Sequence, residues 1–368
     1  RIKNNIKGKN ILSIYTGHDS AAVFIDKNNK LKVLEYERFI KQRYGSFTTA
    51  HKEVKGIGTS DEQRRKFLQY IRDNAKGEIK VIVIDDPDCC DVNLISEYFP
   101  DVKYELVFHH DAHAASGYFT SDFDEAVILS FDGGGACANP LGIIQTEEYH
   151  NLYSLLPTYK YNPDTGNSRF IPPKNTKYDT AMTRGYIARG TNISNIHLGY
   201  ELPSVDGTIE FMLGETYSMF GKSILEIKPG QDWVDPSTNS LAYAGKIMGL
   251  CGYGKIRKEW LHDIGQFYMG GGTIDKTIEE LGDEIGLNLS HNGTSGQQAY
   301  DLIATSQHYF ENIAKKIINY LIERTKVKNV IIVGGCGLNV LLNQKLVKSF
   351  KEKGLNLYIP PYPNDCGL

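Results

Sequence analysis

Three short apolar runs follow one another near the start of the 368-residue chain, and they restrict the fold more than any other feature. They occupy residues 10–15, 21–26 and 31–36, and each has the length of a strand. Turn-forming residues separate the runs at Gly17-His18-Asp19 and at Lys27-Asn28-Asn29. The sequence therefore predicts a domain that opens with three consecutive strands joined by tight turns.

The rest of the chain alternates helical and strand patterns. Ser60, followed by Asp61 and Glu62, has the composition of a helix start. Beyond it the patterns predict strands at 80–84 and 103–108, a helix at 112–119, a second hairpin formed by 126–131 and 142–146 around Asp132-Gly133-Gly134-Gly135, helices at 216–224, 301–326 and 339–352, and a strand at 330–333. We therefore expect a β-β-β-α-β-α unit followed by the start of a second copy.

Two hairpin-led lobes, each with a glycine loop, predict an α/β fold of the two-lobed actin/hexokinase-like class, built from ribonuclease-H-like repeats. In that class a nucleotide lies between the lobes and the hairpin loops approach its phosphates. Backbone N–H groups in such loops bind anions, and only glycine permits the close approach. For any single loop, a plain hairpin turn is the alternative. We place the first lobe at 1–125 and the second at 126–368.

An insert at about 159–207 stands apart from these patterns. It is rich in Asn, Gly, Pro, Thr and Tyr and has little periodicity, as functional or disordered loops do. Aromatic and arginine side chains combine contact area with directional hydrogen bonds, so we expect the insert to cover the cleft and shape a substrate pocket. A surface loop is the alternative. The side chains in question are Tyr161, Arg169, Tyr178, Arg184, Tyr186 and Arg189.

The composition excludes several classes of protein. A net charge of -3 gives no electrostatic reason to expect nucleic acid, and the 23 tyrosines are spread along the chain rather than clustered. The six cysteines form no CxxC pair, which predicts free thiols in a reducing cytoplasm. The longest apolar runs are far too short to cross a membrane, so no membrane association is expected.

Both ends of the sequence suggest a longer protein. The chain opens on Arg1 rather than Met, and it stops within Asn364-Asp365-Cys366-Gly367-Leu368, where an α/β protein would start another helix. We therefore expect this chain to be one part of a larger polypeptide.

The segment His109-His110-Asp111-Ala112-His113 is the strongest candidate for a chemical site. It places three imidazoles and a carboxylate directly after a predicted strand. If a helix begins here, His109 and His113 lie four positions apart and share one face, which is the spacing that presents two ligands to one metal ion. A solvated helix start is the alternative.

Four further polar or glycine-rich turns are candidates for substrate contacts. Gly17-His18-Asp19-Ser20 predicts a contact to a phosphate or similar group, with His18 as hydrogen-bond donor or general base, or else a plain polar turn. Asp132, followed by Gly133 and Gly134, suits a metal-bridged phosphate. The run from Gly334 and Gly335 to Asn339 has the strand-glycine-helix context of a nucleotide contact. Asp365 lies in the final turn, where an Asx turn is the alternative.

These segments resemble the carbamoyltransferases of antibiotic and nodulation-factor biosynthesis. More distantly, the chain is similar to tRNA threonylcarbamoyl-adenosine synthesis proteins and to the hydrogenase-maturation carbamoyltransferase. The histidine segment and Lys246-Ile247-Met248-Gly249-Leu250 are specific, whereas the glycine turns are individually weak. The matching stretches are Gly17–Ala22, Glu37–Phe39, His109–Ser116, Lys246–Leu250 with Tyr253-Gly254, Gly334–Asn339 and Asn364–Gly367.

The resemblance implies a set of site residues. His109, His113 and Asp365 would bind a divalent metal, with iron(II) favoured over manganese or zinc, and Asp365 would arrive from the other lobe. Asp132 would lie near metal-bound phosphates, Gly334, Gly335 and Asn339 near the nucleoside, and His18 near the transferring group.

The resemblance also implies a reaction. Carbamoyl phosphate and ATP, with magnesium, give a carbamoyl-adenylate, and the hydroxyl of a small acceptor then takes the carbamoyl group. The family carries a C-terminal adenylate-forming domain that this sequence lacks, so we expect this chain alone not to release pyrophosphate. A homodimer is left open.

Three alternative functions remain. A tRNA threonylcarbamoyl transferase or an ATP-dependent kinase would share the fold, although the slight acidity speaks against tRNA. A non-catalytic, actin-like nucleotide-binding module would leave the histidine segment unexplained. ATP hydrolysis with and without carbamoyl phosphate, together with metal analysis, would separate these functions.

Overall fold

The computed structural model describes most of the chain, in two compact units. The described residues are 10–17, 19–28, 30–41, 47, 60–75, 77–85, 92–100, 102–107, 109–136, 160–161, 168–169, 180–196, 213–227, 236–269 and 277–365. Among them, residues 10–122 and 360–365 belong to the first unit, with the short strands β7 (Lys160–Tyr161) and β8 (Ser168–Arg169). Residues 123–135 and 181–359 form the second unit.

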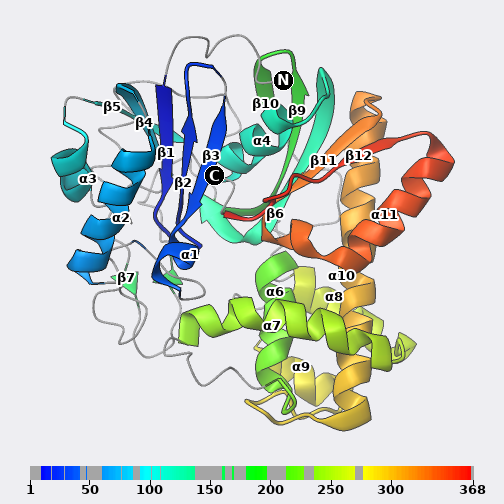
Figure 1. Ribbon diagram of the computed structural model, residues 1–368. Coiled ribbons are helices and arrows are strands. Elements are labelled where there is room, and N and C mark those ends of the chain that lie inside the picture. Colours follow the sequence, from blue (N-terminus) through cyan, green and yellow to red (C-terminus); the bar gives the residue numbers. More distant parts are fainter. Residues whose placement is uncertain are drawn as a thin grey trace. The chain divides into compact units, whose positions relative to one another are not determined.

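A five-stranded mixed sheet forms the centre of the first unit (Figure 1). Its order is β3-β2-β1-β4-β5, and the first three strands are the predicted ones: β1 (Asn10–Tyr15), β2 (Ala21–Ile25) and β3 (Leu31–Glu35) pair antiparallel. Strands β4 (Ile79–Asp85) and β5 (Lys103–Val107) then run parallel to β1. Parallel neighbours need a crossover, which the helices between them supply.

Helices of the first unit cover the sheet with apolar side chains. They are α1 (Tyr36–Ile40), α2 (Asp61–Asn74) and α3 (Val92–Tyr98), and a fourth helix of this unit, α4 (His109–Thr120), follows β5. The predicted helix start at Ser60 is confirmed, because its side chain accepts a hydrogen bond from the Gln63 main chain and Gln63 reciprocates. Phe67, Leu68 and Ile71 of α2 join the buried cluster of the central strands.

The second unit repeats the same strand order in a sheet of its own. Its order is β10-β9-β6-β11-β12, in which β6 (Glu125–Ala136) holds the central place that β1 holds in the first sheet. Strands β11 (Asn329–Val333) and β12 (Asn356–Tyr358) follow in parallel, like β4 and β5. Two copies of one strand order are what the predicted fold class requires, and that prediction is confirmed.

The second hairpin lies elsewhere in the sequence than predicted. The run Asp132–Gly135 is no turn, because β6 continues through it to Ala136, and residues 142–146 lie outside the described part of the chain. The antiparallel pair comes instead from β9 (Thr180–Arg189) and β10 (Asn192–Ile196), which the sequence assigned to a loop-like insert. Gly190, with a φ of 60°, starts the two-residue turn between them.

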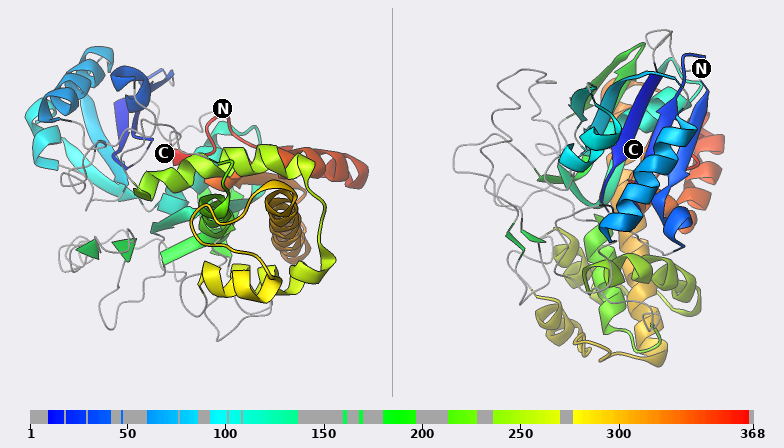
Figure 2. Two further views of the ribbon diagram at one scale, coloured as in Figure 1. Left: turned by 90° about the horizontal axis from the view of Figure 1, so that it is seen from below. Right: turned by 60° about the vertical axis from the view of Figure 1, so that its left-hand side comes forward.

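The long helix α10 (Gly296–Thr325) organises the core of the second unit. Its predicted apolar face is confirmed, and Phe310 stacks on Phe131 of β6 at a ring distance of 6.0 Å. Around it lie α6 (Leu213–Met219), α7 (Pro236–Leu250), α8 (Leu261–Met269), α9 (Ile278–Ile285) and α11 (Val340–Lys353), with the short 3₁₀ turns η2 (Phe220–Ser223), η3 (Cys251–Tyr253), η4 (Lys258–Trp260) and η5 (Gly335–Leu338). Both views in Figure 2 keep α6, α7 and α8 grouped beside α10.

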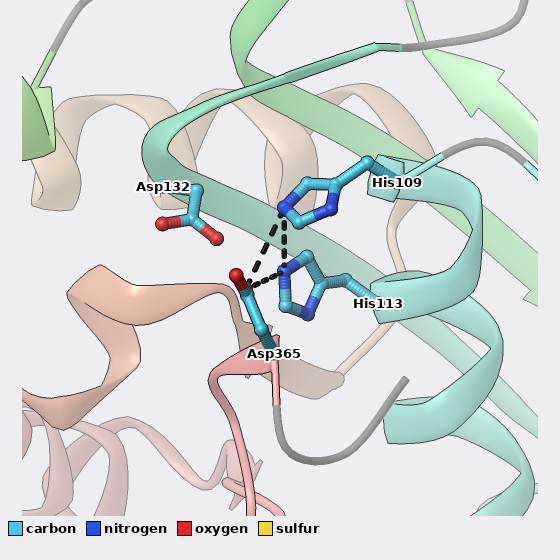
Figure 3. A group of neighbouring side chains, drawn as sticks. All are labelled: His109, His113, Asp132 and Asp365. Atoms are coloured by element: carbon cyan, nitrogen blue, oxygen red, sulfur yellow. Dashed lines mark hydrogen bonds and ion pairs between the residues drawn. The ribbon is translucent and has the colours of Figure 1, made fainter. Parts of the chain in front are cut away.

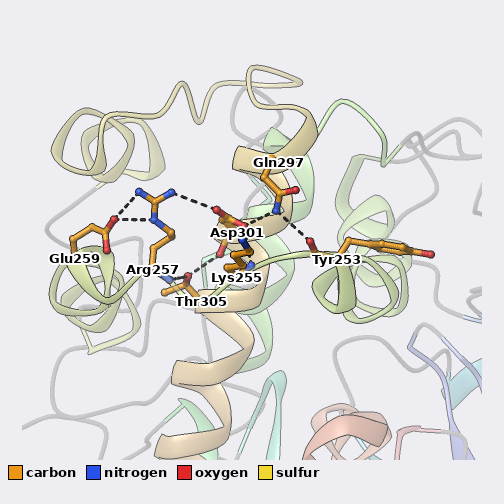
Figure 4. A network of polar contacts seen from close by, with 7 residues as sticks. All are labelled: Tyr253, Lys255, Arg257, Glu259, Gln297, Asp301 and Thr305. Atoms are coloured by element: carbon orange, nitrogen blue, oxygen red, sulfur yellow. Dashed lines mark hydrogen bonds and ion pairs between the residues drawn. The ribbon is translucent and has the colours of Figure 1, made fainter.

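The segment after α7, which contains the Tyr253-Gly254 pair singled out by the sequence, is tied to α10 by one buried carboxylate (Figure 4). Asp301 accepts hydrogen bonds from the Lys255 main chain at 2.8 Å, from Gln297 at 2.8 Å and from Arg257 at 3.4 Å. Gln297 also donates to the Tyr253 carbonyl at 3.2 Å. Burial alone would raise the pKa of Asp301, but these donors outweigh it and hold the pKa below its usual value of 3.8.

Replacing Asp301 by asparagine is expected to destabilise the protein by about 1–3 kcal/mol at pH 7, because the three donors lose their buried, charged acceptor. A lowered pKa in the folded state means that the stabilisation is complete above the unfolded-state pKa and is lost as the pH falls through the folded one. The difference from wild type should therefore shrink below about pH 4. Urea unfolding across a pH series measures the difference in unfolding free energy between wild type and Asp301→Asn. The exposed Asp283 provides the control, Asp283→Asn. A difference in unfolding free energy that grows on acidification would contradict the account.

Two expectations about composition can be compared with the described part of the chain. Cys251 and Cys336, the two cysteines among the described residues, are both free thiols. No helix among the described residues has the length and apolar character needed to cross a membrane.

Candidate metal centre

The pair of histidines is placed by the start of α4. The helix begins at His109, three residues before the predicted start, so His109 and His113 stand one turn apart on the same face. Both are buried, with exposed fractions of 7% and 1%. A buried imidazole pair is not the solvated helix start that the alternative interpretation required.

Asp365 completes a compact triangle of ligand atoms with this pair (Figure 3). The two Nε2 atoms of His109 and His113 lie 3.2 Å apart. Asp365 Oδ1 is 3.3 Å from His113 Nε2 and 3.6 Å from His109 Nε2. The three groups therefore direct one ligand atom each to a common point.

The dimensions of the triangle fit one metal ion. A point equidistant from the three ligand atoms lies about 2 Å from each, which is the bond length of a first-row divalent ion to imidazole nitrogen or carboxylate oxygen. Lone pairs aimed at one buried point repel each other unless a cation or a proton lies between them. Two imidazoles and one carboxylate suit iron(II), manganese or zinc and leave positions open for a substrate.

The sequence led us to expect Asp365 from the other lobe, but the structure places it in the same unit as the histidines. Residues 360–365 belong to the same compact unit as α4, although β12 directly before them belongs to the second unit. All three ligands of the candidate site are therefore supplied by the first unit. The chain returns to this unit after β12, a crossing that no local pattern in the sequence reveals.

Tyr15 is a site residue that the sequence analysis missed. It ends β1, is buried, and donates a hydrogen bond from its hydroxyl to Asp365 Oδ2 at 2.7 Å. Its ring centre lies 6.0 Å from that of His109. The only available signal was its place directly before the polar turn that starts at Gly17.

Three polar residues from the predicted site segments, His110, His18 and Ser20, are not members of the triangle of ligand atoms. His110 is fully buried but is not among the described residues that could share a metal ion, because the position next to His109 on a helix points to a different face. His18 lies outside the described residues. In the same turn, the Ser20 hydroxyl donates to the Gly17 carbonyl and accepts a hydrogen bond from the Phe47 main chain at 2.8 Å, so this hydroxyl stabilises the turn.

Close approach of another chain segment accounts for Gly334 and Gly335, whereas a Cβ atom on Gly133 would meet no atom within 4 Å. Gly133 and Gly134 lie within β6, where the Gly133 main chain donates to Asp132 Oδ1 at 2.6 Å. A Cβ atom on Gly334 would lie 2.2 Å from the Phe131 carbonyl oxygen, and one on Gly335 would lie 2.8 Å from Asp132 Oδ1. The turn after β11 is thus pressed against β6, and the predicted nucleotide contacts of these four glycines and of Asp132 stay predictions.

Asn339 caps the start of α11. Its Oδ1 accepts from the Leu342 main chain at 3.0 Å, as a helix N-cap does, and its amide exchanges two hydrogen bonds with Gln307, each of 3.0 Å. Gln307 also accepts from Tyr217 and donates to Glu311. This network fixes the glycine turn to α10; a contact of Asn339 with a nucleoside stays a prediction.

Cys336, next to these glycines, is not an activated thiol. Burial, with the neighbouring charge of Asp132, raises the pKa of its thiol well above the usual value. The thiol form is a poor nucleophile and a poor metal ligand. The chemistry of the site is therefore expected from imidazole and carboxylate groups.

Comparisons with known proteins identify a family model that covers most of the chain. The model of the carbamoyltransferase N-terminus matches residues 92–368, a stretch that contains all three candidate ligands. Among solved structures, full-length HypF in its phosphate- and nucleotide-bound form has a TM-score of 0.50 and 14% identity, over 100% of this chain and 55% of that one. A likeness at this identity concerns the fold alone.

Curated relatives are much longer than this chain. The uncharacterized protein MJ1051 of Methanocaldococcus jannaschii is 22% identical, over 97% of this chain and 55% of its own length. The uncharacterized protein sll1178 of Synechocystis sp. is 23% identical, over 70% of this chain and 34% of its own length. The chain thus spans between a third and about half of these relatives.

Proposed function

This chain belongs to the carbamoyltransferase family, and we propose that it contributes the metal-dependent site of an O-carbamoyl transfer. In the proposed reaction, carbamoyl phosphate and ATP give a carbamoyl-adenylate, whose carbamoyl group passes to the hydroxyl of a small acceptor. The observation that carries the proposal is the buried triangle of His109, His113 and Asp365. A nucleotide-binding module without catalysis has no use for such a ligand set.

His109, His113 and Asp365 would hold the divalent ion, with iron(II) favoured. When bound, the ion would polarise a phosphate or carbamoyl oxygen and lower the pKa of the acceptor hydroxyl. Three protein ligands would leave other coordination positions for substrate oxygens. Their burial keeps water away from the reacting groups and strengthens each charge interaction.

The glycine turn after β11 is the proposed contact for the nucleotide. Main-chain N–H groups at the start of a helix bind phosphates and neighbouring groups, and Asn339 begins α11 there. The phosphate- and nucleotide-bound form of HypF, which shares the fold, supports a nucleotide in this protein as well. ATP with magnesium is the proposed nucleotide.

The transfer step balances without any further reactant. The acceptor oxygen forms a bond to the carbamoyl carbon, and the bond from that carbon to the phosphate oxygen of AMP breaks. AMP leaves with the electron pair, and the hydroxyl proton passes to a base, for which His18 is the proposed residue.

The experiment separates binding of the metal from transfer. The chain is loaded with iron(II) under anaerobic conditions and given carbamoyl-adenylate with a panel of hydroxylated metabolites. Mass spectrometry then detects carbamoylated products, while AMP release is measured for every acceptor and for water alone. We expect metal-dependent AMP release and at least one carbamoylated acceptor.

Three results would speak against the proposal. Metal-loaded protein that does not accelerate AMP release would exclude transfer from the adenylate. When ATP replaces the adenylate, ATP hydrolysis that does not depend on carbamoyl phosphate but does depend on an acceptor would indicate a kinase. When tRNA is added to the acceptor panel, modification of tRNA in place of the small metabolites would indicate the threonylcarbamoyl transferase.

A further inference from the structure

The two oxygens of Asp365 have different surroundings. Oδ1 faces the pair of histidines, at 3.3 Å from His113 Nε2 and 3.6 Å from His109 Nε2. Oδ2 accepts the hydrogen bond of the Tyr15 hydroxyl at 2.7 Å. The carboxylate and the phenol are both buried, so water does not compete freely for either group.

We propose that Tyr15 is a positioning residue that holds Asp365 as a one-oxygen ligand. The inference rests on the proposed metal-binding role of the triangle. A carboxylate binds a metal through one oxygen or through both, and an oxygen that accepts a short hydrogen bond from a phenol has a lower electron density to offer the ion. Tyr15 therefore selects Oδ1 as the ligand atom and turns the plane of the carboxylate toward the histidines.

Gly17 provides the space that this arrangement needs. A Cβ atom at position 17 would lie 2.3 Å from the Tyr15 hydroxyl oxygen and 2.6 Å from the ring carbon that carries it. The turn after β1 therefore passes directly over the phenol, and only glycine leaves the hydroxyl in place. Gly17 therefore allows the Tyr15 hydroxyl to reach Asp365, independently of any contact between the turn and a substrate.

One-oxygen ligation has a chemical consequence. If Oδ2 also bound the ion, it would occupy a coordination position that a substrate oxygen needs. Tyr15 thus preserves an open position for the carbamoyl or phosphate oxygen. Loss of the phenol should therefore change the geometry of the bound ion as well as its affinity.

The test uses Co²⁺ as a probe, because its visible absorption reports the number and geometry of its ligands. Tyr15→Phe removes one hydroxyl and keeps the ring. We expect the Co²⁺ dissociation constant to rise on the order of 10-fold to 100-fold, with a weaker and shifted visible band. Inorganic phosphate, as a probe of the open position, should perturb the band of wild type more than that of Tyr15→Phe.

Two more variants make the test specific. Gly17→Ala keeps the phenol but displaces its hydroxyl, so it should reproduce the changes seen with Tyr15→Phe. Tyr36→Phe is the control: it removes a buried phenol whose ring packs between Phe47 and Phe67, and it should leave the Co²⁺ affinity and band unchanged. Circular dichroism verifies that each variant is folded, and if one of the two test variants is not, the other decides.

The outcomes distinguish this inference from the proposed function. Wild-type affinity and an unchanged band in the folded variants would overturn the role of Tyr15 and leave the metal site standing. Failure of the wild-type chain to bind Co²⁺ would overturn both. Metal binding that weakens in Tyr15→Phe, in a protein that transfers no carbamoyl group, would support Tyr15 and overturn the proposed function.

Discussion

Alanine at both His109 and His113 is expected to abolish metal binding and carbamoyl transfer together. Two of the three ligands are lost, and the remaining carboxylate cannot hold a divalent ion at micromolar concentration. Transfer should fall on the order of 10³-fold or more, since the ion would supply the polarisation that drives the reaction. Elemental analysis of the purified variant and AMP release from carbamoyl-adenylate measure the two effects.

His110→Ala is the matched control for this double variant. It comes from the same helix and is as deeply buried, but its ring belongs to a different face. Its loss should lower the free energy of unfolding by about 1–3 kcal/mol while the metal content stays at one ion per chain. Full metal content in the double variant, or loss of metal in His110→Ala with the fold intact, would contradict the ligand assignment.

Gly334→Ala is expected to destabilise the second unit by about 4 kcal/mol or more. Its φ of 89° and ψ of 164° belong to a region that is nearly restricted to glycine, and a Cβ atom would lie 2.2 Å from the Phe131 carbonyl oxygen. Neither chain segment can move away, because each is a strand or turn in the core of the sheet. Urea unfolding followed by tryptophan fluorescence measures the loss.

Gly354→Ala separates backbone conformation from close packing. Gly354 ends α11 with a φ of 63°, and a Cβ atom there would meet no atom within 4 Å. Its replacement should cost about 1 kcal/mol, the ordinary penalty of a left-handed alanine. Equal losses in the two variants would mean that the contact with Phe131 contributes nothing to the requirement for glycine at 334.

Local sequence patterns were sufficient for the elements that carry a regular signal. The three opening strands and the Ser60 cap depend on neighbours within a few positions, and all of them were predicted. β9 and β10 were missed because Thr, Arg, Asn and Gly fill many of their positions. Tyr186 and Ala188 are buried there by their place in the sheet, so tertiary context rather than apolar alternation determines the strand.

The residues of the candidate site also divide into those that a local sequence pattern predicts and those that it does not. His109 and His113 were found from spacing alone, because a helix brings positions four apart onto one face. Asp365 was identified through family resemblance, and the prediction of its lobe was wrong because the chain crosses between units after β12. Tyr15 lies 350 positions from Asp365, and nothing in either local sequence indicates their hydrogen bond.

Anomalous diffraction at the absorption edge of the bound metal tests the central claim most directly. Crystals of the iron(II)-loaded protein should show one strong peak about 2 Å from His109 Nε2, His113 Nε2 and Asp365 Oδ1, with Tyr15 still donating to Oδ2. No peak at that point in metal-loaded crystals, with the two imidazoles and the carboxylate bonded only to one another, would contradict the account.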